Sequence, residues 1–307
     1  MNVNSFLQPM QPWPGLAPYA RTLRLPGSGL SLFIYATEPY PAGPAGNIPL
    51  ILVHGLADEA DTWRHILPSL STGRRFIALD LPGFGRSEKP DRPYTLPFFH
   101  DVLLELLDSL EIPRASLLGH SLGAVIAHWV AMAHPGRVEQ LALIGGSLVS
   151  RAQKIDLLTL LFLVPGLGEW LYNRLRRDPQ AAYRSLERYY HRLEGLPQAD
   201  REFLFQRVNE RVWNDRQRRA FLSTFRNLAR WAASEQRSLA SALSDLRIPT
   251  LAVWGEADRI NPLENGRALV EAQPATRLVV VPGAGHNVHQ ENPAAVLEAL
   301  RGFFLSL

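Results

Sequence analysis

Residues 115–133 read ASLLGHSLGAVIAHWVAMA, and this stretch decides the fold class. A short apolar run at 115–118 is followed by Gly-His-Ser-Leu-Gly at 119–123 and then by an alanine-rich apolar segment at 122–133. This order predicts a strand, a sharp turn and a helix, with Ser121 on the turn between two glycines that let strand and helix approach closely. Because amides at the start of such a helix can stabilise a developing negative charge, we predict that Ser121 is a nucleophile.

Short apolar runs alternate with helical stretches on both sides of this turn. The runs that predict strands are 21–25, 30–36, 49–53, 76–79, 115–118, 138–144, 250–254 and 277–281. The segments with helical spacing are 61–70, 96–110, 122–133, 262–272 and 293–304. Buried strands that alternate with helices imply a mostly parallel sheet covered on both faces. We therefore expect an α/β fold with an eight-stranded sheet flanked by helices.

The alternating pattern stops between residues 149 and 244, where the spacing is helical and the strand runs are missing. A helical segment inside an otherwise continuous α/β pattern is typical of a cap inserted above a sheet. We expect a core made of residues 21–148 and 245–307, a helical cap at 149–244, and an extended, proline-containing lead-in at 1–20.

The composition is that of a globular protein, with 46% hydrophobic and 20% charged residues in a chain of 307. There is no cysteine, which excludes disulfides, cysteine-ligated zinc and a cysteine nucleophile. Residues 1–20 lack the basic and apolar regions of a signal peptide, and no apolar run reaches the length of about 18 residues that a membrane span needs. We expect a cytoplasmic protein.

The positive charge is concentrated in the expected cap. Residues 151–240 contain 17 Lys and Arg against 10 Asp and Glu, whereas the whole chain carries a net charge of +3. A basic module can meet anionic lipid or nucleic acid. No nucleic-acid motif accompanies the charge, so we expect no nucleic-acid partner and interpret the arginines as a solvated helical surface.

A nucleophilic serine needs a base, and the base needs a carboxylate that orients it. His286 follows the last strand run in a glycine-containing loop, and Asp258 follows the strand run 250–254 after a short turn. We predict that His286 is the base and Asp258 its acid partner. His289 is the nearest rival base, which we interpret as a loop-capping or surface histidine. Glu256 is the local alternative acid, which we expect to face solvent.

The oxyanion of such a reaction needs backbone donors close to the serine. His54-Gly55-Leu56 follows the strand run 49–53, and Leu122 follows Ser121. From these positions we assign the oxyanion hole to the backbone N–H groups of Leu56 and Leu122. His54 itself is interpreted as a hydrogen-bonded histidine that shapes the turn.

These motifs resemble the α/β-hydrolase superfamily, in particular its cap-bearing serine hydrolases. The matching segments cover nearly the whole chain: 54–55, 80–87, 119–123, 254–258 and 285–286. The order Ser121, Asp258, His286 is the one that this family uses. The resemblance implies that Asp80 belongs to a mainly structural turn. The turn at 119–123 corresponds to the nucleophile elbow of this family. Haloalkane dehalogenases and epoxide hydrolases have aspartate at the nucleophile position of the elbow, whereas this chain has Ser121.

We expect a serine hydrolase that cleaves a hydrophobic carboxylic ester through an acyl-enzyme, with no cofactor and no metal. The resemblance leaves alternatives open. One is a C–C bond hydrolase, or an acyltransferase or perhydrolase, that uses the same catalytic triad of Ser121, His286 and Asp258. Monoacylglycerol-lipase-like enzymes are also among the cap-bearing members that the chain resembles. Another is a non-catalytic ligand-binding protein on this fold. The oligomeric state and the natural substrate stay unassigned, because fold alone does not fix function.

An apolar segment in the expected cap, 157–164, is followed by Pro165-Gly166. We predict that Leu160, Phe162 and Leu163 line the pocket for an apolar acyl chain, where each buried CH₂ contributes about 0.8 kcal/mol. Because arginines flank the segment, a weak peripheral contact with an anionic membrane is the alternative.

Overall fold

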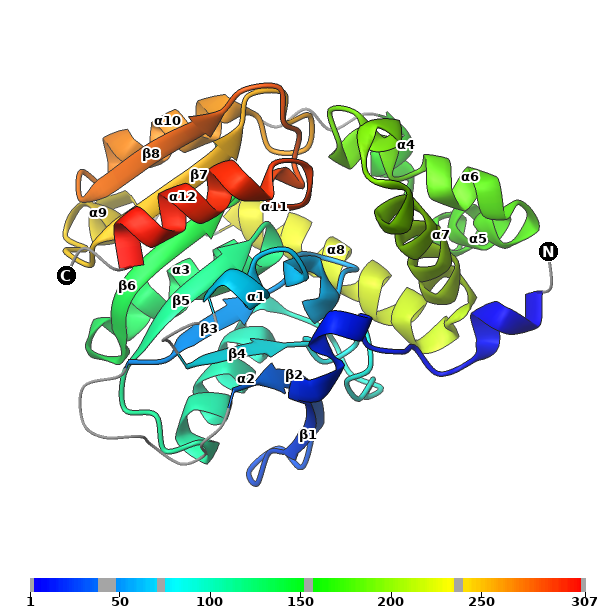
Figure 1. Ribbon diagram of the computed structural model, residues 1–307, viewed down its shortest axis with the longest axis horizontal. Helices are drawn as coiled ribbons and strands as arrows, with labels where there is room; N and C mark the ends of the chain where they lie inside the picture. Colours follow the sequence, from blue (N-terminus) through cyan, green and yellow to red (C-terminus); the bar gives the residue numbers. More distant parts are fainter. Residues whose placement is uncertain (1–2, 38–47, 71–74, 152–156, 235–239, 305–307) are drawn as a thin grey trace.

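The computed structural model describes residues 3–37, 48–70, 75–151, 157–234 and 240–304. Its centre is one eight-stranded sheet in the order β1-β2-β4-β3-β5-β6-β7-β8 (Figure 1). The strands are β1 (Ala20–Arg24), β2 (Ser31–Ala36), β3 (Leu50–Val53), β4 (Phe76–Leu79), β5 (Ala115–His120), β6 (Val138–Ile144), β7 (Thr250–Gly255) and β8 (Thr276–Val281). β2 is antiparallel to both of its neighbours, and the pairs from β4 to β8 are parallel. The mostly parallel, eight-stranded α/β architecture is therefore confirmed.

Helices cover both faces of this sheet (Figure 1). They are α1 (Leu67–Leu70), α2 (Leu96–Ser109), α3 (Leu122–Ala133), α10 (Leu263–Ala272), α11 (Val288–Glu291) and α12 (Pro293–Phe304). Short 3-10 helices lie at Ala60–Trp63 and Pro135–Arg137.

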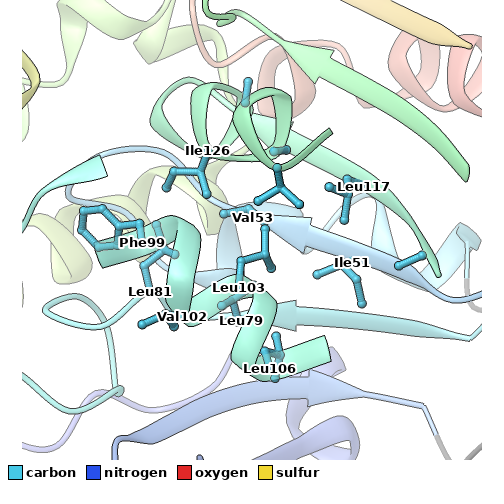
Figure 2. Packing of buried hydrophobic residues seen from close by; sticks show 14 of the residues in the cluster. Ile51, Val53, Leu79, Leu81, Phe99, Val102, Leu103, Leu106, Leu117 and Ile126 are labelled. Carbon is cyan, nitrogen blue, oxygen red and sulfur yellow. The ribbon is translucent and has the colours of Figure 1, made fainter. Parts of the chain in front are cut away.

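The four residues of β3 show how the two faces are filled. Ile51 and Val53 belong to the apolar cluster that includes residues of α2 and α3 (Figure 2). Leu50 and Leu52 belong to the cluster that includes residues of α12. All four are fully buried. Because successive side chains of a strand point to opposite faces, an uninterrupted apolar run is what a strand covered on both sides requires.

Helix α2 shows the matching periodicity. Phe99, Val102, Leu103 and Leu106 recur at helical spacing and are buried against the sheet (Figure 2). Burial of each such side chain stabilises the fold by roughly 1.5–3 kcal/mol. One apolar stripe therefore fixes which side of α2 faces the core.

Between β6 and β7 the regular elements of the described residues are all helices. The helices are α4 (Leu157–Leu161), α5 (Leu167–Arg174), α6 (Pro179–Arg184), α7 (Gln198–Trp213), α8 (Asp215–Ser234) and α9 (Ala240–Ser244), with 3-10 helices at Leu175–Arg177, Glu187–Tyr189 and Leu193–Gly195. Residues of α5 to α7 bury a small apolar cluster of their own. Helix α8 joins this layer to the core, because Ala220 is buried in the core cluster and Ser223 Oγ accepts a hydrogen bond from Tyr94 N at 3.0 Å. We call the region from α4 to α8 the cap; the boundaries 149 and 244 stay a prediction.

The N-terminal lead-in differs from the extended chain that we expect from its sequence. It contains two 3-10 helices, Val3–Leu7 and Pro14–Tyr19, and Leu16 is fully buried. Proline at the start of the second helix presets a helical φ, which favours a tight turn over an extended strand. Of the helices in the described residues, none is both long enough and apolar enough to cross a membrane.

Candidate active site

Ser121 lies on a strained turn between β5 and α3. Its backbone has φ 52° and ψ −116°, a conformation that costs a non-glycine residue free energy. The turn is tight because a Cβ on Gly119 would lie 2.4 Å from Gly123 O, and one on Gly123 would lie 2.1 Å from Val53 O. Although Ser121 is the N-cap of α3, its side chain makes no capping hydrogen bond, which leaves Oγ available to another partner.

That partner is His286. His286 Nε2 lies 2.9 Å from Ser121 Oγ, and His286 Nδ1 lies 2.8 Å from Asp258 Oδ2. Asp258 Oδ1 accepts from the backbone N–H groups of Ile260 and Asn261, at 2.9 and 2.8 Å, so the carboxylate is fixed on both sides. With Nδ1 donating to Asp258, Nε2 is free to accept the serine proton. The three side chains named from the sequence are thus hydrogen bonded in series.

Each of the three follows the carboxyl end of a parallel strand. Ser121 follows β5, Asp258 follows β7 and His286 follows β8. The carboxyl ends of parallel strands lie at one edge of a sheet, which is where open α/β sheets bind their ligands. Glu256, the rival acid, is exposed, and it accepts a hydrogen bond from Gly283 N at 3.3 Å.

The two segments that carry the amides assigned to the oxyanion hole lie beside the serine. Leu122 N begins α3 directly after Ser121, and a Cβ placed on Gly55 would lie 3.2 Å from Ser121 Cβ, so the turn that carries Leu56 faces the same side chain. Within the described residues, neither the Leu56 nor the Leu122 amide donates a hydrogen bond to a protein acceptor. Both are therefore available to an oxyanion.

His54 and Asp80 shape the backbone around the site. His54 Nε2 accepts from Leu81 N at 2.8 Å and its Nδ1 lies 2.7 Å from Gly55 O, which defines one neutral tautomer. Burial lowers the pKa of His54 and keeps it neutral. Asp80 accepts from the backbone of Ala60 at 2.7 Å. The structural interpretations of both side chains are confirmed.

The interpretation of His289 as a loop-capping or surface histidine is wrong. The side chain is fully buried, with Nε2 2.7 Å from Thr62 Oγ1 and its ring 4.5 Å from the ring of His120. Burial lowers the pKa of His120 to about 3 and that of His289 well below its ordinary value, so both are neutral. Although His120, His286 and His289 lie close together, no group of three or more His, Asp or Glu side chains in the described parts of the chain could hold a metal ion.

The cap reaches this site through Tyr189, a residue that we did not expect here from the sequence. The Tyr189 ring lies 6.1 Å from the His286 ring, and Tyr189 O accepts from Asn287 N at 2.9 Å. Next to it, Tyr190 Oη donates to Gln290 Oε1 at 2.8 Å. No local motif signals these contacts, because they join residues about a hundred positions apart.

The three predicted pocket residues lie in or after α4. Leu160 is 42% exposed, Phe162 packs edge-on against Phe221 of α8 at 6.2 Å, and Leu163 is half-buried. Val164 and Trp170 nearby are 47% and 53% exposed. The acyl pocket and the membrane contact both stay predictions.

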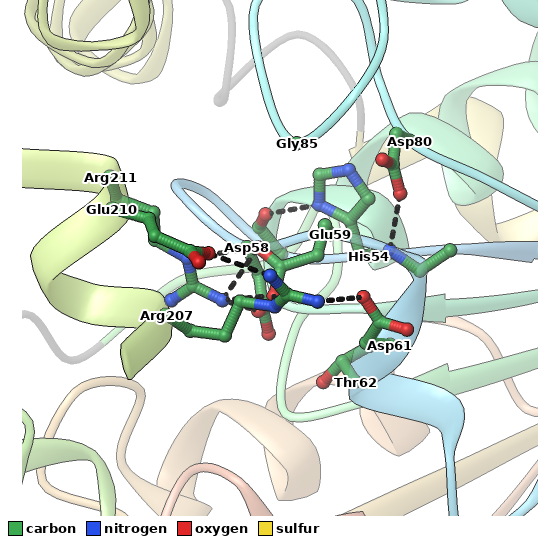
Figure 3. A network of polar contacts seen from close by, with 12 residues as sticks. His54, Asp58, Glu59, Asp61, Thr62, Asp80, Gly85, Arg207, Glu210 and Arg211 are labelled. Atoms are coloured by element: carbon green, nitrogen blue, oxygen red, sulfur yellow. Dashed lines mark hydrogen bonds and ion pairs between the residues drawn. The ribbon is translucent and has the colours of Figure 1, made fainter. Parts of the chain in front are cut away.

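The interpretation of the cap arginines as solvated is wrong for the two that face the core. Arg207 lies 3.2 Å from Asp61, and Arg211 binds Glu59 at 2.7 Å and Asp58 at 2.5 Å (Figure 3). Both arginines are buried. Carboxylates of the core therefore neutralise part of the excess positive charge of the cap.

Comparison with known proteins agrees with this arrangement. Residues 48–293 match the family model described as alpha/beta hydrolase fold. A 2-hydroxymuconate semialdehyde hydrolase from Pseudomonas sp. (strain CF600) is 33% identical over 84% of this chain and 87% of its own. The dihydrolipoyllysine-residue acetyltransferase component of the acetoin cleaving system of Pseudomonas putida is 31% identical over 86% of this chain, which spans only 65% of that relative.

A solved structure gives the same answer for the fold. The 2-hydroxy-6-oxo-6-phenylhexa-2,4-dienoate hydrolase from Rhodococcus sp. strain RHA1 superposes with a TM-score of 0.74 at 23% identity, covering 93% of this chain and 99% of that one. The family model covers most of the chain, and the sheet, the elbow and the strand-end residues have the arrangement that this family uses. The chain belongs to the alpha/beta hydrolase fold family.

Proposed function

We propose that this protein is a serine hydrolase that cleaves a hydrophobic carboxylic ester through an acyl-enzyme. Ser121 Oγ attacks the ester carbonyl while His286 Nε2 takes its proton, and Asp258 stabilises the resulting imidazolium. The amides of Leu56 and Leu122 stabilise the oxyanion. His286 then protonates the departing alcohol. Water next attacks the acyl-enzyme while His286 Nε2 takes its proton, and His286 returns that proton to Ser121 Oγ as the carboxylic acid leaves.

One observation carries this proposal. Ser121 Oγ lies 2.9 Å from His286 Nε2, and His286 Nδ1 lies 2.8 Å from Asp258 Oδ2; within the described part of the chain the amides of Leu56 and Leu122 have no protein acceptor. A binding protein without catalysis has no use for a serine held in a strained backbone conformation, which costs about 1–3 kcal/mol.

The charges around the site favour an uncharged acyl group. Arg207 and Arg211, the cap arginines that face the core, are each bound to core carboxylates. A substrate carboxylate would have to compete with these pairs and pay for its own desolvation. An apolar chain needs no such desolvation, and its burial contributes favourable free energy.

C–C bond hydrolysis is the second candidate. A relative, the 2-hydroxymuconate semialdehyde hydrolase, favours it. The same Ser121, His286 and Asp258 would serve that reaction. The acetyltransferase relative keeps acyl transfer to an acceptor other than water as a further variant.

The test is a series of p-nitrophenyl esters from acetate to dodecanoate, assayed with wild type and with Ser121→Ala. We expect kcat/KM to rise with acyl length and to fall by at least about 10⁴-fold in the variant. A matched pair, p-nitrophenyl hexanoate and mono-p-nitrophenyl adipate, isolates the effect of a terminal carboxylate, and we expect the neutral ester to react faster.

A fluorophosphonate probe separates the alternatives. Labelling of Ser121 without turnover of any ester would contradict ester hydrolysis and favour the C–C candidate. A protein that neither labels at Ser121 nor turns over an ester would be a binding protein on this fold.

A further inference from the structure

A buried cluster of charges joins cap helix α7 to the loop that follows β3. Arg211 Nη2 lies 2.5 Å from Asp58 Oδ1, and its Nε and Nη2 donate to the two oxygens of Glu59 at 2.9 and 2.7 Å (Figure 3). Arg211 is 9% exposed and Glu59 is fully buried. The guanidinium thus holds two successive carboxylates of one loop.

Those carboxylates belong to the loop that carries an oxyanion amide. The loop reads Leu56-Ala57-Asp58-Glu59, so the anchored side chains begin two residues after Leu56. Ala57 has φ 60°, a left-handed conformation that disfavours a residue with a Cβ. The backbone between the amide and the anchor is therefore strained, and the contacts of Asp58 and Glu59 hold it there.

The same loop is attached to the core from the other side. Asp80 Oδ1 accepts from Ala60 N at 2.7 Å, and Arg86 Nη1 lies 3.0 Å from Asp61 Oδ2. From the cap, Arg211 binds the side chains of residues 58 and 59 and Arg207 lies 3.2 Å from Asp61, while within the core Thr62 N donates to Glu59 O at 3.0 Å. The side chains of Asp58 and Glu59, which follow Leu56 most closely, thus both bind an arginine of the cap.

Stability alone is a weak reason for this arrangement. Burying an arginine with two carboxylates costs a desolvation free energy that the ion pairs often fail to exceed, and apolar side chains of similar volume do as well or better. A planar guanidinium that donates to both oxygens of Glu59 does fix orientation, which an apolar contact cannot do.

We propose that Arg211 is a positioning residue that sets the Leu56 amide for catalysis, so that the oxyanion hole is complete only when α7 is docked on the core. This inference rests on the proposed function, because it assigns Leu56 an oxyanion. The cap then contributes to the chemical step without touching the substrate.

The test compares three variants by ester kinetics. We expect Arg211→Met to lower kcat about 10²-fold, with KM within about threefold, because a misplaced donor costs rate and not ground-state binding. Arg211→Lys keeps the charge and should recover part of the loss. The matched control is Asp200→Asn, which removes the negative charge from another buried pair between α7 and the core, Arg64 Nε to Asp200 Oδ1 at 2.6 Å, in which residues 56–59 take no part. We expect it to lower Tm and leave kcat within about twofold.

Amide hydrogen exchange of the peptide covering residues 50–60 provides a readout that is independent of activity. Exchange should accelerate in Arg211→Met and stay at the wild-type rate in Asp200→Asn. Wild-type exchange in Arg211→Met, or a loss of kcat that tracks the loss of Tm equally in both variants, would overturn the positioning role. A rise in KM with unchanged kcat would overturn it too, since Arg211 would then bind substrate. Failure of the wild type to hydrolyse esters would instead overturn the proposed function, and hydrogen exchange would still decide whether Arg211 orders the loop.

Discussion

The nucleophile elbow and the junction between cap and core are held by opposite means. At the elbow, backbone packs directly on backbone, and a Cβ on Gly119 or Gly123 would clash with a carbonyl oxygen. At the junction, the long side chains of Arg207 and Arg211 span the gap between α7 and the loop after β3. The elbow contains small residues close in sequence, whereas the junction joins charged residues about 150 positions apart.

This difference shows where precision comes from in each region. Backbone contact leaves no room for adjustment, so the position of Ser121 is fixed by the local chain. Long charged side chains have many rotamers, and a fixed geometry requires several hydrogen bonds at once. The elbow should therefore respond to added volume, and the junction to loss of a partner.

The largest effect that we expect at the sheet edge comes from Asp258→Asn. The amide cannot stabilise the imidazolium and favours the wrong histidine tautomer, so kcat for a p-nitrophenyl ester should fall about 10⁴-fold with little change in Tm. The matched control is Glu256→Gln, the exposed carboxylate two residues earlier, which should keep wild-type kcat. A loss of similar size in Glu256→Gln would contradict the assignment of Asp258 as the acid partner of His286.

The elbow side of the comparison is tested by Gly123→Ala. The new Cβ would lie 2.1 Å from Val53 O, so α3 must move away from β3. We expect the free energy of unfolding to fall by about 3 kcal/mol, measured by urea denaturation. Gly136→Ala is the control, because a Cβ there meets no atom within 4 Å, and it should leave stability within about 0.5 kcal/mol. Equal stability of the two variants would refute the tight-packing account.

The smallest effect concerns a neutral polar group inside the core, in contrast to the charged junction. His128 is buried, Nδ1 accepts from Leu148 N at 3.2 Å and Nε2 lies 2.9 Å from Gln273 Oε1, and burial lowers its pKa to about 4. The unfolded chain binds a proton at this histidine below its ordinary pKa of about 6.5, whereas the native protein does so only near 4. The stabilisation is therefore present above about pH 6.5 and is lost as pH falls toward 4.

Urea unfolding at pH 8 and pH 5 measures this dependence. Wild type should lose about 2 kcal/mol more than His128→Gln between the two values, because the variant has no histidine to protonate there. An equal loss in both proteins would mean that His128 does not carry the dependence.

Much of the sheet could be predicted from residue patterns. The bounds of β4 and β6 match the apolar runs 76–79 and 138–144, and α3 spans the predicted 122–133. These elements depend on local periodicity, which a single chain displays. Ser121, Asp258 and His286 could be named together for the same reason, since each follows such a strand run.

The misread residues have contacts that are distant in sequence. His289 looks exposed from its neighbours, yet Thr62 accepts or donates its hydrogen bond from 227 positions away. Arg207 and Arg211 look like a solvated helix face, yet they pair with carboxylates on the loop after β3. Tyr189 carries no motif at all and reaches His286 through the placement of the cap.

The sequence by itself determined the strand order along the chain, the elbow and the residue types that follow the strands, because spacing and turn chemistry are local. Only the tertiary structure decided which polar groups are buried, which arginines are paired and which cap residue faces His286. Burial and pairing depend on what lies opposite a side chain, and the partner is set by how the cap docks on the sheet. The same docking places Asp58 and Glu59 against Arg211 next to the Leu56 amide.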